Sequence, residues 1–313
     1  AAICGVRGKK DINIFIMHPK GRTSLIQERQ MTSVLDDNVY NLAVEGTFDD
    51  CQHLMKTIFA DVDFKTEHSL GSVNSVNWAR VLAQTVYYFY AFFRVQERTG
   101  ASEVQFSVPT GNFGDILAGY LAAQMGLPIK KLILATNENN ILSRFFNSGE
   151  YSLGDVVPTL SPSMDIQVAS NFERYLYYRV GCDSAKLTEM MKHFGETGAL
   201  TVDGSDELFA AGEGSTEQTL AMIRKYFDNY DYTLDPHTAV GVAVAERFQC
   251  SETPTICLAT AHPAKFTDAI EQAVGQAAHH PVLDAVVNAE TRCESISNEI
   301  DKVKDYLIAK TAT

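Results

Sequence analysis

A glycine-bracketed loop near the middle of the chain has the residue pattern of a phosphate-binding site. The apolar segment 104–108 favours a strand, and 116–120 favours a helix. Between them lie Gly111, Asn112, Phe113, Gly114 and Asp115. A strand–loop–helix unit directs backbone N–H groups and the positive end of a helix dipole at one point, and glycine lets the backbone approach a ligand closely. The loop has neither the ATP-binding nor the dinucleotide-binding glycine pattern, so we expect the phosphate of a different ligand.

A second group of polar residues upstream is also suited to an anion. Asn74 and Ser75 precede a long aromatic-rich segment, and Arg80 lies within it. Asn and Ser are preferred helix N-caps, so a plain capped helix start is one interpretation. A helix start can also bind an anion, and Arg80 adds a planar fork of N–H donors suited to phosphate. Likewise, the 111–115 loop could be a strand–helix corner without a ligand.

Six segments, in order along the chain, resemble the threonine synthase family in the branch found in fungi and many bacteria. They are 44–51 (VEGTFDDC), 74–80 (NSVNWAR), 110–115 (TGNFGD), 161–166 (SPSMDI), 235–239 (DPHTA) and 260–266 (TAHPAKF). The resemblance covers nearly the whole chain. It implies a two-lobed α/β enzyme of fold type II, similar to the β subunit of tryptophan synthase, with pyridoxal 5′-phosphate (PLP) as its cofactor.

The resemblance also implies roles for individual residues. The 111–115 loop would bind the phosphate of PLP, and Thr260 would hydrogen-bond the pyridine nitrogen, although a strand-end threonine satisfied by backbone is the alternative. Three residues would bind the phosphate of the substrate, O-phospho-L-homoserine: Asn74, Ser75 and Arg80. Asp115 is unusual beside an anion, and we expect it to cap the helix start or to bind a nearby hydroxyl or N–H group.

No lysine of the chain stands where the resembling family has its Schiff-base lysine. We therefore expect this lysine upstream of Ala1, no catalytic residue within the chain, and an N-terminally truncated chain that is inactive by itself. Lys65 and Lys265 are not expected to replace it. His237 and His262 stand at expected helix entrances, where we expect them to be hydrogen-bonding struts rather than bases.

Alternating strand and helix patterns predict a parallel α/β fold. We expect strands at 12–17, 39–44, 104–108, 131–136 and 255–260, and helices at 24–31, 49–59, 77–98, 139–146, 238–247 and 296–310. The polar, glycine-interrupted residues 207–231 are expected to form a peripheral helical insertion. On the resemblance, residues 1–70 would be the remainder of a small lobe. Residues 71–313 would be a large lobe that binds the PLP phosphate and has a helical C-terminal part.

The composition narrows the possible partners and location. A net charge of −13 argues against nucleic-acid and anionic-membrane binding, which need a basic surface. No apolar run approaches the roughly 20 residues of a membrane span. The 6 cysteines are scattered without metal-ligand spacing, so we expect free thiols in the cytoplasm and no metal site.

We therefore expect the full-length protein to be a threonine synthase, a PLP-dependent carbon–oxygen lyase acting on phosphates. It would convert O-phospho-L-homoserine and water to L-threonine and phosphate, as a monomer or homodimer. Two alternatives stay open. One is a threonine synthase-like phospho-lyase that makes a keto acid from the same substrate. The other is a non-catalytic truncated paralogue that binds a partner or a phosphorylated metabolite.

Overall fold

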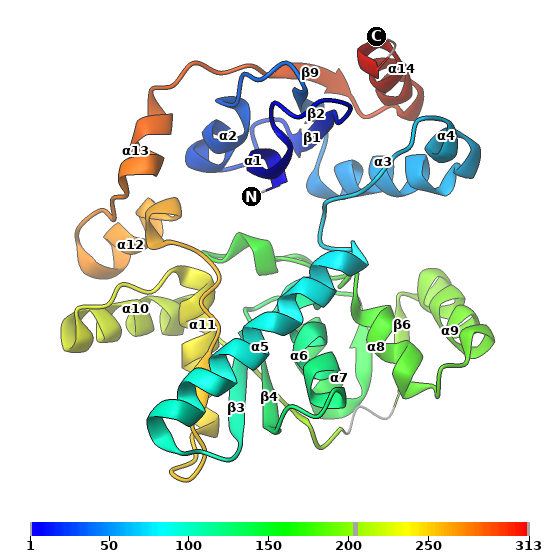
Figure 1. Ribbon diagram of the computed structural model, residues 1–313. Coiled ribbons are helices and arrows are strands. Elements are labelled where there is room, and N and C mark those ends of the chain that lie inside the picture. Colours follow the sequence, from blue (N-terminus) through cyan, green and yellow to red (C-terminus); the bar gives the residue numbers. More distant parts are fainter. Residues whose placement is uncertain (1, 203–205, 312–313) are drawn as a thin grey trace. The chain divides into compact units, whose positions relative to one another are not determined.

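The computed structural model describes residues 2–202 and 206–311 (Figure 1). The contacts divide the chain into two compact units, which we call the first unit (1–72 with 279–313) and the second unit (73–278). The first boundary agrees with the expected division near residue 70. The second differs from the expectation, because residues 279–313 belong to the first unit and not to the lobe that contains the 111–115 loop.

The first unit is built on a three-stranded parallel sheet in the order β1-β2-β9. β2 (Val39–Glu45) pairs with β1 (Ile14–Pro19) and with β9 (Glu294–Ser297), a strand from the far end of the chain. Helix α14 (Ile300–Thr311) packs on α3 (Phe48–Ala60) through Val303 and Leu307. The remaining helices of this unit are α1 (Ala2–Val6), α2 (Leu25–Thr32), α4 (Val62–Glu67) and α13 (Pro281–Val287).

The second unit contains a four-stranded parallel sheet in the order β7-β4-β3-β8. Its strands are β3 (Val104–Pro109), β4 (Ile129–Thr136), β7 (Phe209–Glu213) and β8 (Thr255–Cys257). The short strands β5 (Glu150–Ser152) and β6 (Ala199–Thr201) form a separate antiparallel pair. The helices are α5 (Trp78–Thr99), α6 (Gly114–Gln124), α7 (Ile141–Ser148), α8 (Phe172–Arg179), α9 (Ser184–Thr197), α10 (Thr216–Tyr230), α11 (Pro236–Ala245) and α12 (Thr267–Val274). Three short 3-10 helices complete it: η1 (Pro162–Met164), η2 (Glu246–Phe248) and η3 (Pro263–Lys265).

Helices cover both faces of the four-stranded sheet, as parallel strands require (Figure 1). On one face, Phe106 and Val108 of β3 are buried with Tyr88 of α5 and Leu117 of α6. On the other face, the Ser107 hydroxyl donates a 2.7 Å hydrogen bond to the Gly241 carbonyl of α11. Because β3 is buried on both faces, the loop that follows it is held rigidly at the carboxyl edge of the sheet.

The main strands and helices confirm the expected α/β fold, but three segments differ from the sequence expectations. Residues 207–231 are not a peripheral helical insertion, because β7 completes the main sheet and α10 buries Ile223. The expected strand 255–260 is β8, which ends at Cys257 and not at residue 260. The start of the expected 296–310 helix instead belongs to β9, since its backbone finds a partner in β2. Within the described part of the chain, no helix combines the length and apolar character needed to cross a membrane.

The contact between α6 and α5 gives the first prediction. A Cβ on Gly119 would lie 2.5 Å and 2.7 Å from two ring carbons of the buried Tyr88, and 2.9 Å from a methyl carbon of Leu132. Gly119→Ala should therefore lower the free energy of unfolding by about 1–3 kcal/mol, because overpacking displaces the tyrosine ring. Urea unfolding followed by circular dichroism measures the change.

The control is Gly195→Ala in α9, where nothing lies within 4 Å of the added Cβ. That variant should be stabilised by up to about 1 kcal/mol, because alanine is the better helix former. If both variants shifted equally, the tight contact between α5 and α6 would not be the reason for glycine at position 119.

Candidate functional site

The 111–115 loop leads into a helix whose N-cap residue makes no side-chain cap hydrogen bond. Phe113 is the N-cap residue of α6, with φ of 63°, and it makes no side-chain cap hydrogen bond. A left-handed backbone is unfavourable for a bulky residue and persists only where the surroundings enforce it. Here the Phe113 ring is 1% exposed and lies against the rings of Phe172 and Tyr175. Core packing thus holds the loop in a shape that leaves the first N–H groups of α6 open to a ligand.

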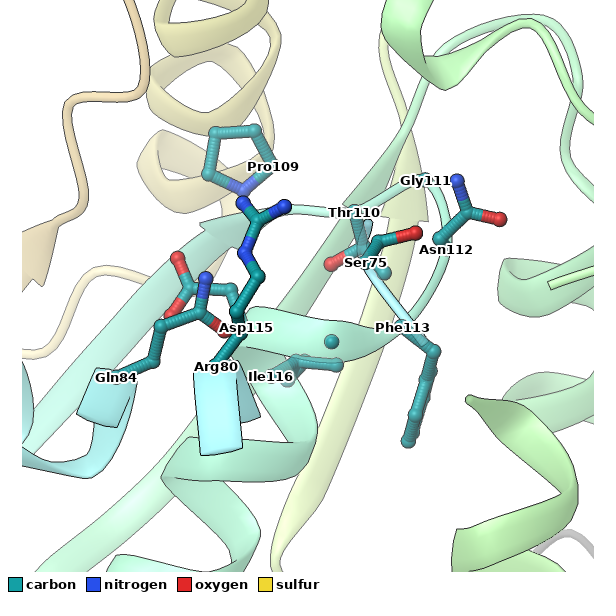
Figure 2. Close-up of a pocket in the computed structure, with 11 residues that line it drawn as sticks. Ser75, Arg80, Gln84, Pro109, Thr110, Gly111, Asn112, Phe113, Asp115 and Ile116 are labelled. Atoms are coloured by element: carbon teal, nitrogen blue, oxygen red, sulfur yellow. The ribbon is translucent and has the colours of Figure 1, made fainter. Parts of the chain in front are cut away.

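A pocket of about 150 Å³ lies at this helix start (Figure 2). Its walls are Ser75, Arg80 and Gln84, together with residues 109–116. Figure 2 shows Arg80 and Gln84 rising from α5 on one side of the loop, whereas the Phe113 ring points away from it. Pockets for whole small molecules usually measure about 300–1,000 Å³, so this one suits small anionic groups, such as the phosphate ends of larger ligands.

The pocket contains only part of the predicted substrate-phosphate set, which is Asn74, Ser75 and Arg80. Ser75 and Arg80 line it, whereas Asn74 does not, and the Asn74 Oδ1 accepts the Val76 N–H at 2.7 Å. Arg80 is exposed, and its Nη1 donates to the Val73 carbonyl at 3.0 Å. The N-cap of α5 is Asn77, so the interpretation of Asn74 or Ser75 as this cap is wrong. Arg80 keeps further N–H donors for an anion.

Asn171, which the sequence analysis missed, joins the two predicted anion-binding segments. Its Nδ2 donates to the carbonyls of Ser75 and Asn112, each at 3.0 Å, and its side chain is wholly buried. Its backbone N–H donates to the same Asn112 carbonyl. No local sequence signal marks this role, because both partners are backbone atoms distant in the chain. Gln84 was also missed, but its position one helical turn after Arg80 is a signal that could have found it.

A neighbouring backbone segment leaves no room for a side chain at Gly111, whether or not a ligand is bound. A Cβ at this position would lie 2.5 Å from the carbonyl oxygen of Ser163, in the η1 turn. From the sequence, the expected reason for a glycine here is the close approach of a phosphate to the backbone. In the structure, a side chain at this position would clash with the η1 backbone unless that backbone moved.

Asp115 is a largely buried carboxyl at the edge of the pocket. The Tyr88 hydroxyl donates to its backbone carbonyl at 2.8 Å and to its Oδ1 at 3.3 Å. Burial raises the pKa of Asp115 from 3.8 to about 6, and the hydrogen bond from Tyr88 only partly opposes the shift. Asp115 therefore binds a nearby hydroxyl, which is one of the two roles expected for it, and it does not cap α6.

Thr260 is not one of the residues that line the pocket. It follows the end of β8 as an exposed residue, and its N–H donates to the Thr238 hydroxyl at 3.1 Å. His237 and His262 act as struts, as expected: a ring nitrogen of His237 accepts the Ser163 N–H, and one of His262 accepts the Ala264 N–H.

The two candidate lysines do not line the pocket either. Lys65 lies in α4 of the first unit, and Lys265 lies in η3 of the second unit. That neither lysine binds the cofactor covalently stays a prediction.

Comparison with known proteins connects this chain to one family. A family model described as "Threonine synthase, C-terminal" matches residues 238–307. The threonine synthase of Saccharomyces cerevisiae is 48% identical in an alignment of 297 positions, which covers 88% of this chain and 58% of the yeast protein. That of Pseudomonas aeruginosa is 46% identical in an alignment of 315 positions, which covers 98% of this chain and 67% of the relative. The chain thus spans well under two thirds of the yeast protein's length.

A solved structure agrees with these matches. The PLP-bound threonine synthase of Brucella melitensis superposes with a TM-score of 0.89 at 43% identity. The match covers 100% of this chain and 68% of that one. It confirms the fold type II architecture that the resemblance implies.

The raised pKa of Asp115 gives the second prediction. An unfolded chain loses this proton as the pH rises through about 4, whereas the folded chain keeps it until about pH 6. Wild-type stability should therefore fall between these pH values. Asp115→Asn keeps an acceptor for Tyr88 and has no charge to bury. Relative to wild type, it should gain up to about 3 kcal/mol between pH 4 and pH 7.

Urea unfolding at several pH values measures this difference. Asp305→Asn, at an exposed position of α14, should change stability by less than about 0.5 kcal/mol across the range. A constant difference between Asp115→Asn and wild type from pH 4 to pH 7 would contradict the assignment.

Proposed function

The chain belongs to the threonine synthase family, and we propose that the pocket beside α6 holds the phosphate of PLP in an enzyme that makes L-threonine from O-phospho-L-homoserine and water. The observation that carries the proposal is the uncapped start of α6 within a pocket of anion-binding residues. Backbone N–H groups and the helix dipole at such a place favour an anionic group such as a phosphate.

The residues present fit this cofactor at its phosphate end. We assign the phosphate to the loop residues, Gly111, Asn112, Phe113, Gly114 and Asp115, which all line the pocket. The small pocket volume suits the phosphate, and the aromatic part of the cofactor would extend beyond it. Thr260 would offer its hydroxyl to the pyridine nitrogen without requiring that nitrogen to be protonated.

The substrate's phosphate would be bound by residues on the α5 side of the same pocket. Arg80 carries the positive charge there, and Ser75 adds polar groups at the wall. Asn74 would act indirectly, because its side chain accepts the Val76 N–H and so shapes the turn before α5. This arrangement supports recognition of a phosphorylated amino acid, since arginine forms planar, charge-assisted hydrogen bonds with phosphate.

When bound, PLP would supply an electron sink for the substrate's Cα and Cβ. The groups of this chain would bind and orient the two phosphates. We propose that no lysine of residues 1–313 attaches the cofactor covalently, and that this lysine belongs to the part of the family's chain that has no counterpart here. All six cysteines are free, which supports a reducing compartment such as the cytoplasm.

The third prediction concerns cofactor binding by residues 1–313. The chain should bind PLP reversibly through its phosphate, so inorganic phosphate should compete with it. After reduction with borohydride, peptide mapping should find neither Lys65 nor Lys265 modified, and no threonine should form. Absorbance titration and mass spectrometry give these results. Threonine formation together with modified Lys265 would overturn the assignment of the lysine.

The fourth prediction separates the two phosphates. Arg80→Lys in an active full-length protein should lower kcat/KM for O-phospho-L-homoserine by about ten- to a hundredfold, because an ammonium group cannot reproduce the planar fork. The affinity for PLP should barely change. Phosphate release and cofactor absorbance measure the two effects.

Arg94→Lys is the matched control on the same helix. Arg94 pairs with Glu97 at 3.0 Å, and it does not line the pocket, so both quantities should stay at wild-type values. If Arg80→Lys lost PLP but kept a normal kcat/KM in the loaded fraction, Arg80 would belong to the cofactor and not to the substrate.

A further inference from the structure

We propose that Asp235 is a positioning residue that holds two separate places of the cofactor site, the 111–115 loop and Thr260, in a set relation to each other. The inference rests on the proposed function, because those two places are the ones assigned to the phosphate and the ring nitrogen of PLP. Asp235 itself does not line the pocket, so it would act only through other residues.

Asp235 is a buried carboxylate at the start of α11. Its side chain caps the helix by accepting the N–H groups of His237 and Thr238, and the residue is 2% exposed. Burial works against its charge, but hydrogen bonds from His237 and Thr238 outweigh burial and hold its pKa below the usual range. The carboxylate is therefore charged, and each of its oxygens is engaged by a neighbour that leads toward the site.

The first path runs through His237 to the loop. The His237 Nε2 lies 3.2 Å from the Ser163 backbone nitrogen, whose N–H donates to it. The Nδ1 must then carry the ring proton, and it lies 3.2 Å from the Asp235 Oδ1. Asp235 thus selects the tautomer that holds Ser163, and the Ser163 carbonyl is the group that abuts Gly111. Asp235 therefore fixes the orientation of the His237 ring, and the ring fixes the position of the Ser163 backbone that packs against the loop.

The second path runs through Thr238 to Thr260. The Thr238 hydroxyl donates to the Asp235 Oδ2, and its oxygen accepts the Thr260 N–H at 3.1 Å. Thr260 lies beyond the last residue of β8, so the sheet does not fix its backbone. The hydroxyl of Thr238 is the described hydrogen-bond partner that ties this N–H to a buried element. Without it, Thr260 would be free to move relative to α11.

The two paths make a distinction between ligands. Inorganic phosphate needs only the loop, whereas PLP, held at its phosphate and at its ring nitrogen, needs the loop and Thr260 in register. A cap that merely stabilised α11 would affect both ligands alike, through the folded fraction. A positioning residue would affect PLP selectively when only the second path is broken.

The test compares paired variants of residues 1–313 by titration with PLP and, separately, with inorganic phosphate. Thr238→Val keeps the shape but removes the hydroxyl, and Thr238→Ser restores it. Thr238→Val should weaken PLP binding by about three- to tenfold, the effect of one lost hydrogen bond, and leave phosphate binding within about twofold. Thr238→Ser should bind both ligands like wild type. Circular dichroism and urea unfolding give the folded fraction of each variant.

The His237 variants test the first path. The side-chain amide of asparagine reaches about as far as the imidazole Nδ1. His237→Asn therefore keeps an N–H donor for Asp235 but loses the acceptor of the Ser163 N–H. His237→Gln reaches the Nε2 position and keeps that acceptor. His237→Asn should therefore weaken both PLP and phosphate, and His237→Gln should weaken them less. Asp235→Asn should disturb both paths, but a change at a buried carboxylate can prevent folding, so the other variants decide.

The outcomes separate this inference from the proposed function. Wild type that binds inorganic phosphate but not PLP overturns the proposed function, and this inference with it. Wild type that binds PLP, with unchanged PLP affinity in Thr238→Val, overturns this inference alone. Equal losses for PLP and phosphate in folded Thr238→Val also overturn it. Amide hydrogen exchange gives a ligand-free check: Thr238→Val should speed exchange at Thr260 and not at Ser163, and the opposite pattern would contradict the second path.

Discussion

The site depends on the left-handed backbone of Phe113. This one residue turns the chain from β3 into α6, and its side chain makes no cap hydrogen bond, so it leaves the first N–H groups of the helix to other partners. The strain is tolerated because the Phe113 ring is packed among other aromatic rings in the largest core cluster. Hydrophobic packing on one side of the loop thereby maintains an unsatisfied polar surface on the other, which is the usual physical condition of a binding site.

Two buried carboxyl groups near the site show how neighbours decide charge. Asp115 has one hydroxyl as its side-chain partner, and burial raises its pKa to about 6. Asp235 has an imidazole, a hydroxyl and two backbone N–H groups, which together lower its pKa in spite of burial. The first group is easier to protonate than an ordinary aspartate, so it places less negative charge beside the pocket as the pH falls toward 6. The second suits a permanent structural link, because a charged group holds its donors firmly.

The surroundings of the loop come from segments that are far apart in the chain. Asn171 binds the backbone of Ser75 and Asn112, and Ser163 closes over Gly111. Each of these contacts ends on a backbone atom, so the partner's side chain leaves no trace in the sequence. The first unit shows the same principle, since β9 joins β2 only because the chain returns there after the whole of the second unit.

The sequence by itself determined the local elements, and the residue types of the loop indicated an anion site. Apolar runs and turn residues predicted β2, β3 and α5 to within about one residue, because strand and helix periods are local properties of the chain. They also predicted the strand–loop–helix corner and its suitability for phosphate.

Tertiary structure alone decided which segments share a sheet, where β8 ends, and which buried groups hold the loop. The assignment of residues 279–313 to the first unit and of 209–213 to the main sheet required the pairing partners. The roles of Asn171, Ser163 and Asp235 required three-dimensional proximity. The physical reason is that hydrogen-bond pairing and burial are properties of atoms brought together by the fold, and residue types in a linear chain specify them only through that fold.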